Sequence, residues 1–522
     1  YPIRYFHPKD LCIISYIEEA DDFIQNEKPF HLGFLPTEQS NPLTRELDRE
    51  FARSGADGVR NLQTVDREVL KMAKRVFASP EFAALAAAVE ATVRGGHRVI
   101  FSGCGATGRL SILLESMWKK ACRTHGAPYA DRVESIMTGG DYALVKSVES
   151  FEDYAAFGAR QVRDRNFTAA DLLVAITEGG ETSSVLGTVA EATRLGAKAF
   201  LLFNNPAKLL AAHLERSRQA IENPRVTVLD LSCGPMALAG STRMQATTSE
   251  QLIASAALEV ALRKLLQKDG KIDFAAAFAG LLDQLERDAA VKGMADYIDF
   301  ETEIYRKGGR VTYFADDFML DIFTDTTERS PTFMLPPFRK LDDAVSPPPW
   351  ALARNPLADC AGTMLRALGH EPRCIEWTLD GYRAMNAPAK VLANPPAISC
   401  AELYKFPLGN EPLPERFATG HDAAVLFGWQ RPAPELEAAY RAATKDAAQR
   451  RTLAVGGDAI PLAVEPTLLR LWEHLAIKLV LNTISTGTMV KLGRVAGNWM
   501  SFVAVSNKKL IDRAIRLVEE LS

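Results

Sequence analysis

The feature of this 522-residue chain that most constrains its fold is a regular alternation of short apolar runs with longer amphipathic stretches. The first set of apolar runs lies between residues 97 and 231 and reads HRVIFSG, VESIM, DLLVAIT, AKAFLLF and VTVLDL. Intervening stretches such as SSVLGTVAEATRLG space their apolar residues near the helical period of about 3.6. Short buried strands that alternate with such helices predict a parallel sheet covered by helices on both faces.

A second set of the same kind follows the first. We expect strands at GRVTYFA, PRCIEW, DAAVLFGW and RRTLAVGG, and a closing helix at PTLLRLWEHLAIKLVLNTIS, which parallels a long helix at roughly 242–267 in the first set. The proline-rich stretch PTFMLPPFRKLDDAVSPPPW is expected to be loop. The predicted fold class is α/β, with two tandem domains, each a mostly parallel five-stranded sheet flanked by helices in a flavodoxin-like three-layer sandwich.

The pattern divides the chain into four segments. They are an N-terminal arm (1–60), a first domain that carries a glycine-rich loop (61–267), a helical connector (268–308) and a second domain (309–522). A chain of this length can form two or three domains with a sizeable buried core.

Charge and cysteine usage exclude several classes of partner. The net charge is −4 and the sequence pI is about 6.2, so neither nucleic acid nor an anionic membrane surface is expected as a partner. No run approaches the ~18 apolar residues of a membrane span. The eight histidines form no metal-binding spacing, so no metal or other cofactor is expected. The seven cysteines are scattered and never form C-x-x-C, which is typical of a reducing compartment and predicts a cytoplasmic protein.

The stretch FSGCGATGRL contains a G-x-G-x-x-G formed by Gly103, Gly105 and Gly108, between an apolar strand and a helical run. Amides at such a helix N-terminus favour an anion, and the Thr107 hydroxyl is well placed for a monophosphate. A dinucleotide would need an acidic residue about 20 residues after the loop. Asp141 lies 33 residues past Gly108 and follows a glycine pair. A small phosphate is therefore favoured, while a dinucleotide and a tight turn without ligand stay open as alternatives.

Two further segments of the first set are rich in hydroxyl groups, one at the end of a strand and one at the start of the long closing helix. They are ITEGGETSS (176–184) and GSTRM (240–244). A hydroxyl before a helix usually only caps it. Three loops of this kind at successive carboxyl ends of one open sheet nevertheless coincide with the place where such sheets bind ligands. Their convergence favours a small phosphorylated ligand.

These residues carry a resemblance to a known family. The region from GCGATGR to GPMALAGSTRM resembles the sugar isomerase (SIS) domain of the N-acetylmuramic acid 6-phosphate etherase and glucokinase regulatory protein family. The segments TGGDYALVKSVESFED (138–153), KLVLNTISTGTMVKLGRVAGNWM (478–500) and NKKLIDRA (507–514) are similar to further signatures of that family. The two-unit layout is similar to that of the regulatory protein, whereas the bacterial etherase has one SIS domain per chain and dimerises.

The departures from the family pattern are complementary between the two units. Where the etherases have a catalytic Glu after the glycine loop, the first unit has Met117, and Glu115 is out of register. The second unit has no glycine loop, but Glu328 fits the family's E-x-x-P-T pattern. The first closing helix has Gln251 where the family has Lys, and the second keeps Lys478. We therefore expect one composite site per chain, with Glu328 and Lys478 reaching the phosphate loop from the second unit; chance retention is the alternative.

The resemblance implies roles for particular residues. Glu328 and Glu152 match the catalytic carboxylates, which act on the proton beside a carbonyl and on a departing ether oxygen. The expected substrate-binding residues offer hydroxyl groups, charges or close backbone approach, and they are Gly103, Gly105, Thr107, Glu149, Thr177, Gly179, Thr182, Ser183, Ser241, Thr242, Arg243 and Lys478.

Two functions of different classes stay open. The first is a phosphosugar-binding protein that resembles the glucokinase regulatory protein and has a sugar kinase as its partner. The second is an etherase-like carbon–oxygen lyase that eliminates lactate and then adds water, with a sugar-phosphate isomerase as a weaker third choice. Both require a small-molecule sugar phosphate, and both are compatible with a monomer or a homodimer.

Overall fold

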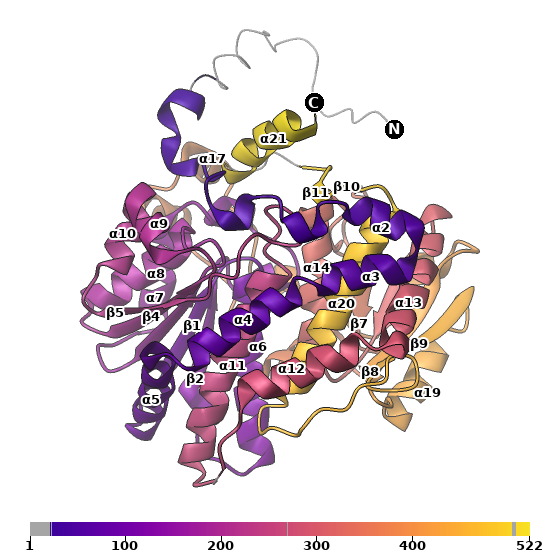
Figure 1. The fold of residues 1–522 in the computed structure, drawn as a ribbon, viewed down its shortest axis with the longest axis horizontal. Coiled ribbons are helices and arrows are strands. Elements are labelled where there is room, and N and C mark those ends of the chain that lie inside the picture. Colours follow the sequence, from indigo (N-terminus) through magenta and orange to yellow (C-terminus); the bar gives the residue numbers. More distant parts are fainter. Residues whose placement is uncertain (1–20, 22, 269, 504–507, 522) are drawn as a thin grey trace.

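The computed structural model describes residues 21, 23–268, 270–503 and 508–521, which form two parallel sheets with helices around and between them (Figure 1). The first sheet has the strand order β2-β1-β3-β4-β5, and all its strands are parallel. Its strands are β1 (Val99–Gly103), β2 (Val133–Met137), β3 (Leu172–Ile176), β4 (Lys198–Phe203) and β5 (Val226–Asp230). Each coincides with an apolar run of the sequence, so the predicted first sheet is confirmed.

Helices cover both faces of this sheet. The central strands β1 and β3 are buried along their whole length, as expected for a sheet between two helical layers. The α-helices of the first half are α2 (Leu47–Arg53), α3 (Gly55–Gln63), α4 (Asp66–Phe77), α5 (Pro80–Arg94), α6 (Ala106–Thr124), α7 (Ala155–Asp164), α8 (Ser183–Arg194), α9 (Ala207–His213), α10 (Glu215–Ile221) and α11 (Gln245–Leu265).

The second sheet is also parallel, but it has four strands in the order β7-β6-β8-β9 rather than the expected five. They are β6 (Val311–Phe314), β7 (Ala351–Arg354), β8 (Ala423–Trp429) and β9 (Gln449–Val455). The edge position is taken by β7, directly after the proline-rich loop.

The segment PRCIEW, expected as a strand, is irregular because it pairs with the first unit instead. Pro372 has no N–H to donate to a ladder. The next residue, Arg373, donates its N–H to the Asp141 carboxylate (2.7 Å) and accepts the Asp141 N–H at its carbonyl oxygen (3.2 Å). The backbone of this segment therefore joins the two units rather than extending the second sheet.

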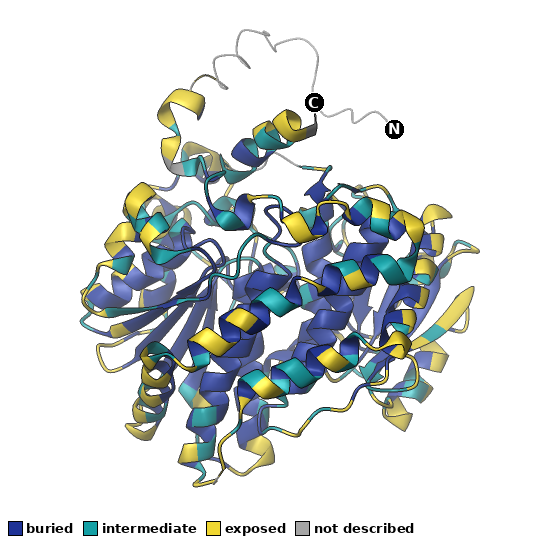
Figure 2. Cartoon of the chain, viewed as in Figure 1, coloured by how far each residue is buried: buried dark blue, intermediate teal, exposed yellow. Residues whose placement is uncertain are grey.

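Long helices connect the two sheets. Helix α11 packs against α20, and α6 packs against α14, so each pair unites the first unit with the second. These helices and both sheets form the buried interior (Figure 2). The α-helices of the second half are α12 (Phe274–Leu285), α13 (Asp288–Arg306), α14 (Met319–Phe333), α15 (Cys360–Leu368), α16 (Leu379–Ala384), α17 (Ala389–Ala393), α18 (Cys400–Leu403), α19 (Pro434–Ala443), α20 (Leu471–Lys491) and α21 (Lys508–Leu521).

In the described part of the chain, no single helix is long and apolar enough to cross a membrane. The segments Gly55–Phe77 and Pro80–Arg94 meet the length and composition criteria only when taken together, and they are bent by 70° at the break between them.

Candidate functional site

The glycine-rich loop joins β1 to α6 in a turn that requires its glycines. Gly105 has φ +57° and ψ −123°, a conformation that residues with a Cβ rarely adopt. A Cβ on Gly103 would lie 2.4 Å from the carbonyl carbon of Thr107, and one on Gly108 would lie 2.7 Å from Cγ of Met137. The strand and helix therefore pack closely, and the loop presents the amino end of the 19-residue helix α6 at the carboxyl edge of the sheet.

The Thr107 side chain has a structural part in this loop. Its hydroxyl accepts the backbone N–H of Cys104 (3.0 Å) and donates to the carbonyl oxygen of the same residue (2.8 Å). Thr107 is fully buried, and its hydroxyl group stabilises the turn.

A cleft of about 150 Å³ opens beside Gly105 and is lined by both units. The first unit contributes the glycine loop and the loops after β2, β3 and β5, and the second contributes α14 and α21. The cleft brings together, of the expected site residues, Gly105, Glu149, Glu152, Thr182, Ser241, Thr242, Arg243 and Glu328.

The other expected residues lie behind the cleft wall. Thr177 donates its hydroxyl to that of Thr182 (3.0 Å), and the Gly179 carbonyl oxygen accepts the side-chain amide of Asn205 (3.0 Å). Gly103 is enclosed by α6, and Ser183 begins α8. These residues support the loops around the cleft but do not line it.

Lys478 lines a neighbouring hollow together with Arg243 and Glu328, and its ammonium group is hydrogen-bonded to four oxygen atoms of the protein. It donates to the carbonyl oxygens of Arg243 (3.1 Å) and Met244 (2.8 Å), to the hydroxyl of Thr248 (2.6 Å) and to Oδ1 of Asn482 (2.9 Å). Burial lowers the pKa of Lys478 to about 7. The lysine thus holds the start of α11, the helix that follows the GSTRM segment.

Glu328 reaches from the second unit into the first. It lies on α14 and forms an ion pair with Arg109 of α6. The Arg109 guanidinium also donates to the carbonyl oxygens of Leu144 and Ala143, both at 3.1 Å. Glu115, the acid out of register in the first unit, is buried away from the cleft and paired with Arg373. The geometry therefore gives the cleft a carboxylate from the second unit.

Arg243 and Ser241, which line the cleft, carry hydrogen-bonding atoms without partners within the described residues. The Arg243 guanidinium pairs with Asp325 and donates through Nη2 to the Ser485 hydroxyl (2.8 Å). Its Nε and Nη1, and the hydroxyl oxygen of Ser241, have no hydrogen-bond partner within the described residues, although both side chains are buried. Because buried polar groups are nearly always satisfied, these atoms can each take a further hydrogen-bond partner.

Carboxyl groups with raised pKa values face these donors. Burial raises the pKa of Glu152 to about 8, against the opposing charge of Lys509 and with the help of Glu149. Burial also raises the pKa of Glu178 to about 7, and the nearby Glu328 acts in the same direction. Sequence reasoning missed Glu178, although it lies between two expected residues in ITEGGETSS. The cleft therefore contains carboxyl groups that titrate near neutral pH.

Helix α21 adds two cations that sequence reasoning also missed, Lys509 and Arg513. Lys509 Nζ lies 3.5 Å from Glu181 Oε1 and 3.7 Å from Glu38 Oε1; burial opposes its charge, but these carboxylates outweigh burial and raise the pKa of Lys509. Arg513 donates to Glu38 (2.9 Å) and covers Gly240. The signal was the NKKLIDRA motif, whose first residue lies outside the described part of the chain.

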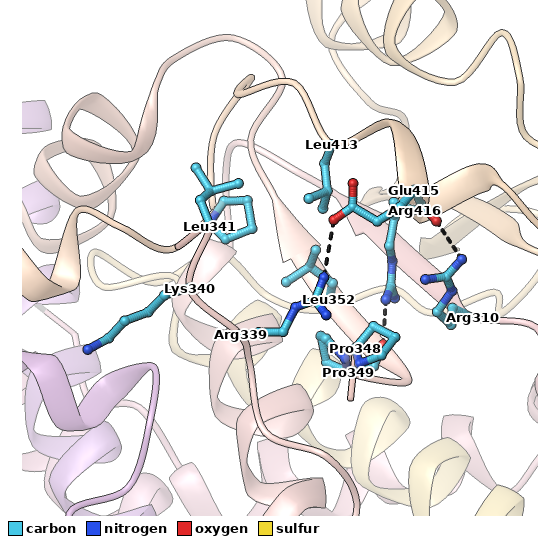
Figure 3. Close-up of a pocket in the computed structure, with 11 residues that line it drawn as sticks. Arg310, Arg339, Lys340, Leu341, Pro348, Pro349, Leu352, Leu413, Glu415 and Arg416 are labelled. Atoms are coloured by element: carbon cyan, nitrogen blue, oxygen red, sulfur yellow. Dashed lines mark hydrogen bonds and ion pairs between the residues drawn. The ribbon is translucent and has the colours of Figure 1, made fainter. Parts of the chain in front are cut away.

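A different pocket, in the second unit, has no buried side-chain nitrogen or oxygen without a hydrogen-bond partner among its described lining residues (Figure 3). Arg416 donates to the carbonyl oxygens of Val311 (2.7 Å) and Trp350 (3.0 Å), and burial lowers its pKa to about 9. Arg310 is paired with Asp422. Arg416 therefore holds the end of the proline-rich segment against β6. No group of three or more His, Cys, Asp or Glu side chains in the described ranges is arranged to hold a metal ion.

The fold and the cleft together define a class of protein. Such a protein has two tandem α/β units, with a candidate ligand site at the carboxyl edge of the first sheet, and the second unit completes that site. The family model "Glucokinase regulatory protein N-terminal SIS domain" matches residues 82–193. The chain is 32% identical over 222 residues to an N-acetylmuramic acid 6-phosphate etherase from Aeromonas hydrophila, covering 42% of this chain and 68% of the relative. A relative of the same name from Yersinia pestis is 34% identical over 223 residues, with the same coverage. The chain belongs to the N-acetylmuramic acid 6-phosphate etherase family, which confirms the resemblance.

Among solved structures, a tagatose-6-phosphate ketose/aldose isomerase from Escherichia coli aligns with a TM-score of 0.45 and 10% identity, over 88% of this chain and 97% of that one.

Proposed function

We propose that this protein binds a sugar phosphate in the cleft between its two units, one molecule per chain. The observation that carries the proposal is the set of buried, unused donors on Arg243 beside the glycine loop and the amino end of α6. A guanidinium and a helix N-terminus are both suited to a phosphate. The carboxyl groups of Glu149, Glu152 and Glu178 line the same cleft and are suited to accept hydrogen bonds from sugar hydroxyls.

A second candidate function, an etherase-like lyase, is favoured by the contrast between two carboxyl groups. Glu152, whose pKa burial raises to about 8, is a proton donor at neutral pH, whereas Glu328 forms an ion pair with Arg109. In an elimination, the carboxylate would take the proton beside the carbonyl while the carboxylic acid protonates the departing ether oxygen, so that the carbon–oxygen bond breaks. Addition of water to the resulting double bond would complete the reaction.

Incubation with N-acetylmuramic acid 6-phosphate separates the two functions. Binding is read from the thermal midpoint, which a ligand of the folded state raises by mass action, and turnover is read from released lactate. Lactate release that is lost in Glu328→Gln would establish the lyase. Binding without release would leave the protein as a phosphosugar-binding protein, and absence of any shift with all hexose 6-phosphates would overturn the proposal.

We also propose domain bounds, a protein partner and a cellular location for this chain. The tandem domains would span 61–267 and 309–522, with the connector between them containing α12 and α13. The match to the regulatory-protein domain supports a sugar kinase as a protein partner. A reducing location such as the cytoplasm is consistent with the free thiols of Cys104, Cys122 and the other described cysteines.

Gly105→Ala is expected to weaken sugar-phosphate binding at least about tenfold. A Cβ at φ +57° and ψ −123° is strained by about 1–3 kcal/mol, so the loop must rearrange at the phosphate position. Titration calorimetry against the wild type measures this loss. The matched control is Gly96→Ala, which also has a positive φ (+79°) but lies in an exposed turn away from the cleft. An equal loss in both variants would mean that the effect is general destabilisation.

Glu152→Gln is expected to make the protein more stable than the wild type at high pH. The folded-state pKa of about 8 exceeds the ordinary value of 4.5, so the fold favours the protonated form. As the pH rises from about 4.5 to 8, the wild type therefore progressively loses the free energy of unfolding that the protonated Glu152 side chain contributes. The Glu152→Gln variant has a neutral amide at every pH and has no such loss. Thermal midpoints should coincide at pH 4 and favour the variant by several degrees at pH 8.5. The exposed Glu303→Gln serves as control, and a pH-independent difference would contradict the assignment.

A further inference from the structure

An apolar groove of about 480 Å³ adjoins the cleft. The two hollows share the lining residues Ser147, Glu149, Pro331 and Leu510, so they are continuous. The groove runs along the carboxyl-terminal half of α14 and under the start of the proline-rich loop. Its volume lies in the range of about 300–1,000 Å³ that is typical of small-molecule pockets.

The hydroxyl groups in the groove wall are already used within the protein. Thr326 and Thr327 donate to backbone carbonyl oxygens one turn earlier in α14, at 2.6 Å and 2.5 Å, and Ser330 donates to the carbonyl oxygen of Leu335 (2.9 Å). Side chains bonded in this way offer little to a polar ligand. Lys146, Ser147 and Glu149 also line the groove. The rest of the wall is hydrocarbon, from Val145, Pro331, Met334, Leu335, Pro336, Pro337, Phe338, Pro347 and Leu510.

The wall is also built to stay open. Pro336 and Pro337 have no N–H groups and a fixed φ, so this side of the groove is stiff. Met334 ends α14 with φ +51°, an uncommon conformation for a residue with a side chain. It is a groove-lining residue and keeps 37% of its surface exposed. An apolar side chain held exposed by an unfavourable backbone conformation indicates a use for that surface.

The groove lies next to the reactive part of the cleft. Glu328 and Pro331 are three residues apart on α14 and so lie on neighbouring positions of one helix face. Glu328 lines the cleft, Pro331 lines both hollows, and Met334, a further three residues along, lines the groove. A substituent on the sugar atom that faces Glu328 would therefore extend along α14 into the groove.

We propose that this groove binds an apolar substituent of the phosphosugar, so that the ligand is a sugar phosphate carrying an aryl or branched alkyl group as an ether or glycoside. The inference rests on the proposed sugar-phosphate function, because the phosphate and sugar occupy the cleft while the substituent occupies the groove. Because the two hollows are continuous and the groove wall is mainly apolar, an apolar substituent of the bound sugar can extend into the groove. A groove that served a protein partner would make no distinction between plain and substituted sugars.

Calorimetric titration with matched ligands tests the proposal. The probes are glucose 6-phosphate, its phenyl glycoside and its 3-O-benzyl ether, with phenyl glucoside lacking phosphate as a control. At least one aryl derivative is expected to bind about tenfold or more tightly than glucose 6-phosphate, because the ring leaves water for an apolar wall. If no hexose 6-phosphate binds, with or without an aryl group, the proposed function fails; if sugar phosphates bind but neither aryl group adds affinity, this inference alone is overturned.

Two variants at Met334 test whether the aryl group that adds affinity binds in the groove. Met334→Asn removes apolar surface while suiting the positive φ, since Asn tolerates that conformation. It is expected to abolish the aryl gain and to leave glucose 6-phosphate affinity unchanged, because Met334 does not line the cleft. Met334→Leu should keep the gain. An aryl gain that survives Met334→Asn undiminished would place the ring elsewhere and contradict the groove assignment.

Discussion

Replacing Arg243 with glutamine is expected to weaken sugar-phosphate binding by about a hundredfold. Arg243 lines the cleft, its Nε and Nη1 have no hydrogen-bond partner within the described residues, and charge-assisted hydrogen bonds contribute about 1.5–3 kcal/mol each. Glutamine keeps one amide group that can donate hydrogen bonds, but it loses the positive charge and the paired N–H groups of the guanidinium. Titration calorimetry with a hexose 6-phosphate measures the loss directly.

The control for this prediction is Arg383→Gln, an exposed arginine on α16 that is paired with Asp380. It should bind like the wild type. Because Arg243 also pairs with Asp325, the variant must be shown to be folded by its circular dichroism and its thermal midpoint. Unchanged affinity in a folded Arg243→Gln protein would remove Arg243 from the phosphate site.

The largest effect on stability is expected from Arg329→Met. Arg329 is fully buried on α14 and pairs with Glu301 (2.7 Å) and Asp325 (2.7 Å), and Asp325 in turn pairs with Arg243. Arg329 and Arg243 outweigh burial and lower the pKa of Asp325. Removing one arginine leaves a buried carboxylate without compensation, which costs about 3–5 kcal/mol. The urea midpoint of unfolding should fall accordingly.

A double variant separates charge from packing in this network. Adding Glu301→Gln to Arg329→Met removes the orphaned charge and is expected to recover part of the loss, so that the two substitutions are not additive. Glu301 also accepts hydrogen bonds from Tyr305 (2.8 Å) and Tyr313 (2.7 Å), which an amide oxygen can still accept. Additive destabilisation would show that the network acts through packing alone.

The sequence predicted the fold well wherever a strand is a continuous apolar run. The first sheet is buried on both faces, and its strands match the runs between residues 97 and 231. The second sheet was less predictable at its edge. β7 is a four-residue strand that follows a proline run, too short to show a period, whereas PRCIEW has strand-like composition but uses its backbone to join Asp141 of the first unit. Contacts between units override local propensity there.

The site was predictable in its loops and less so in its side chains. The motif identified Gly105, and the complementary losses identified Glu328, which lines the cleft beside that loop. The motif could not show that the Thr107 hydroxyl bonds to its own loop, or that the Lys478 ammonium group bonds to carbonyl oxygens at the start of α11. Nor could sequence spacing place Lys509 in the cleft, because its position depends on how α21 docks against residues far away in the chain, such as Glu38.

The two units of one chain are proposed to form a single sugar-phosphate site. The most direct test is the stoichiometry of N-acetylmuramic acid 6-phosphate binding, measured by titration calorimetry on the wild-type chain. We expect one molecule per chain, and binding that is about a hundredfold weaker in Arg243→Gln. Two molecules per chain, or binding that is indifferent to Arg243, would contradict this proposal.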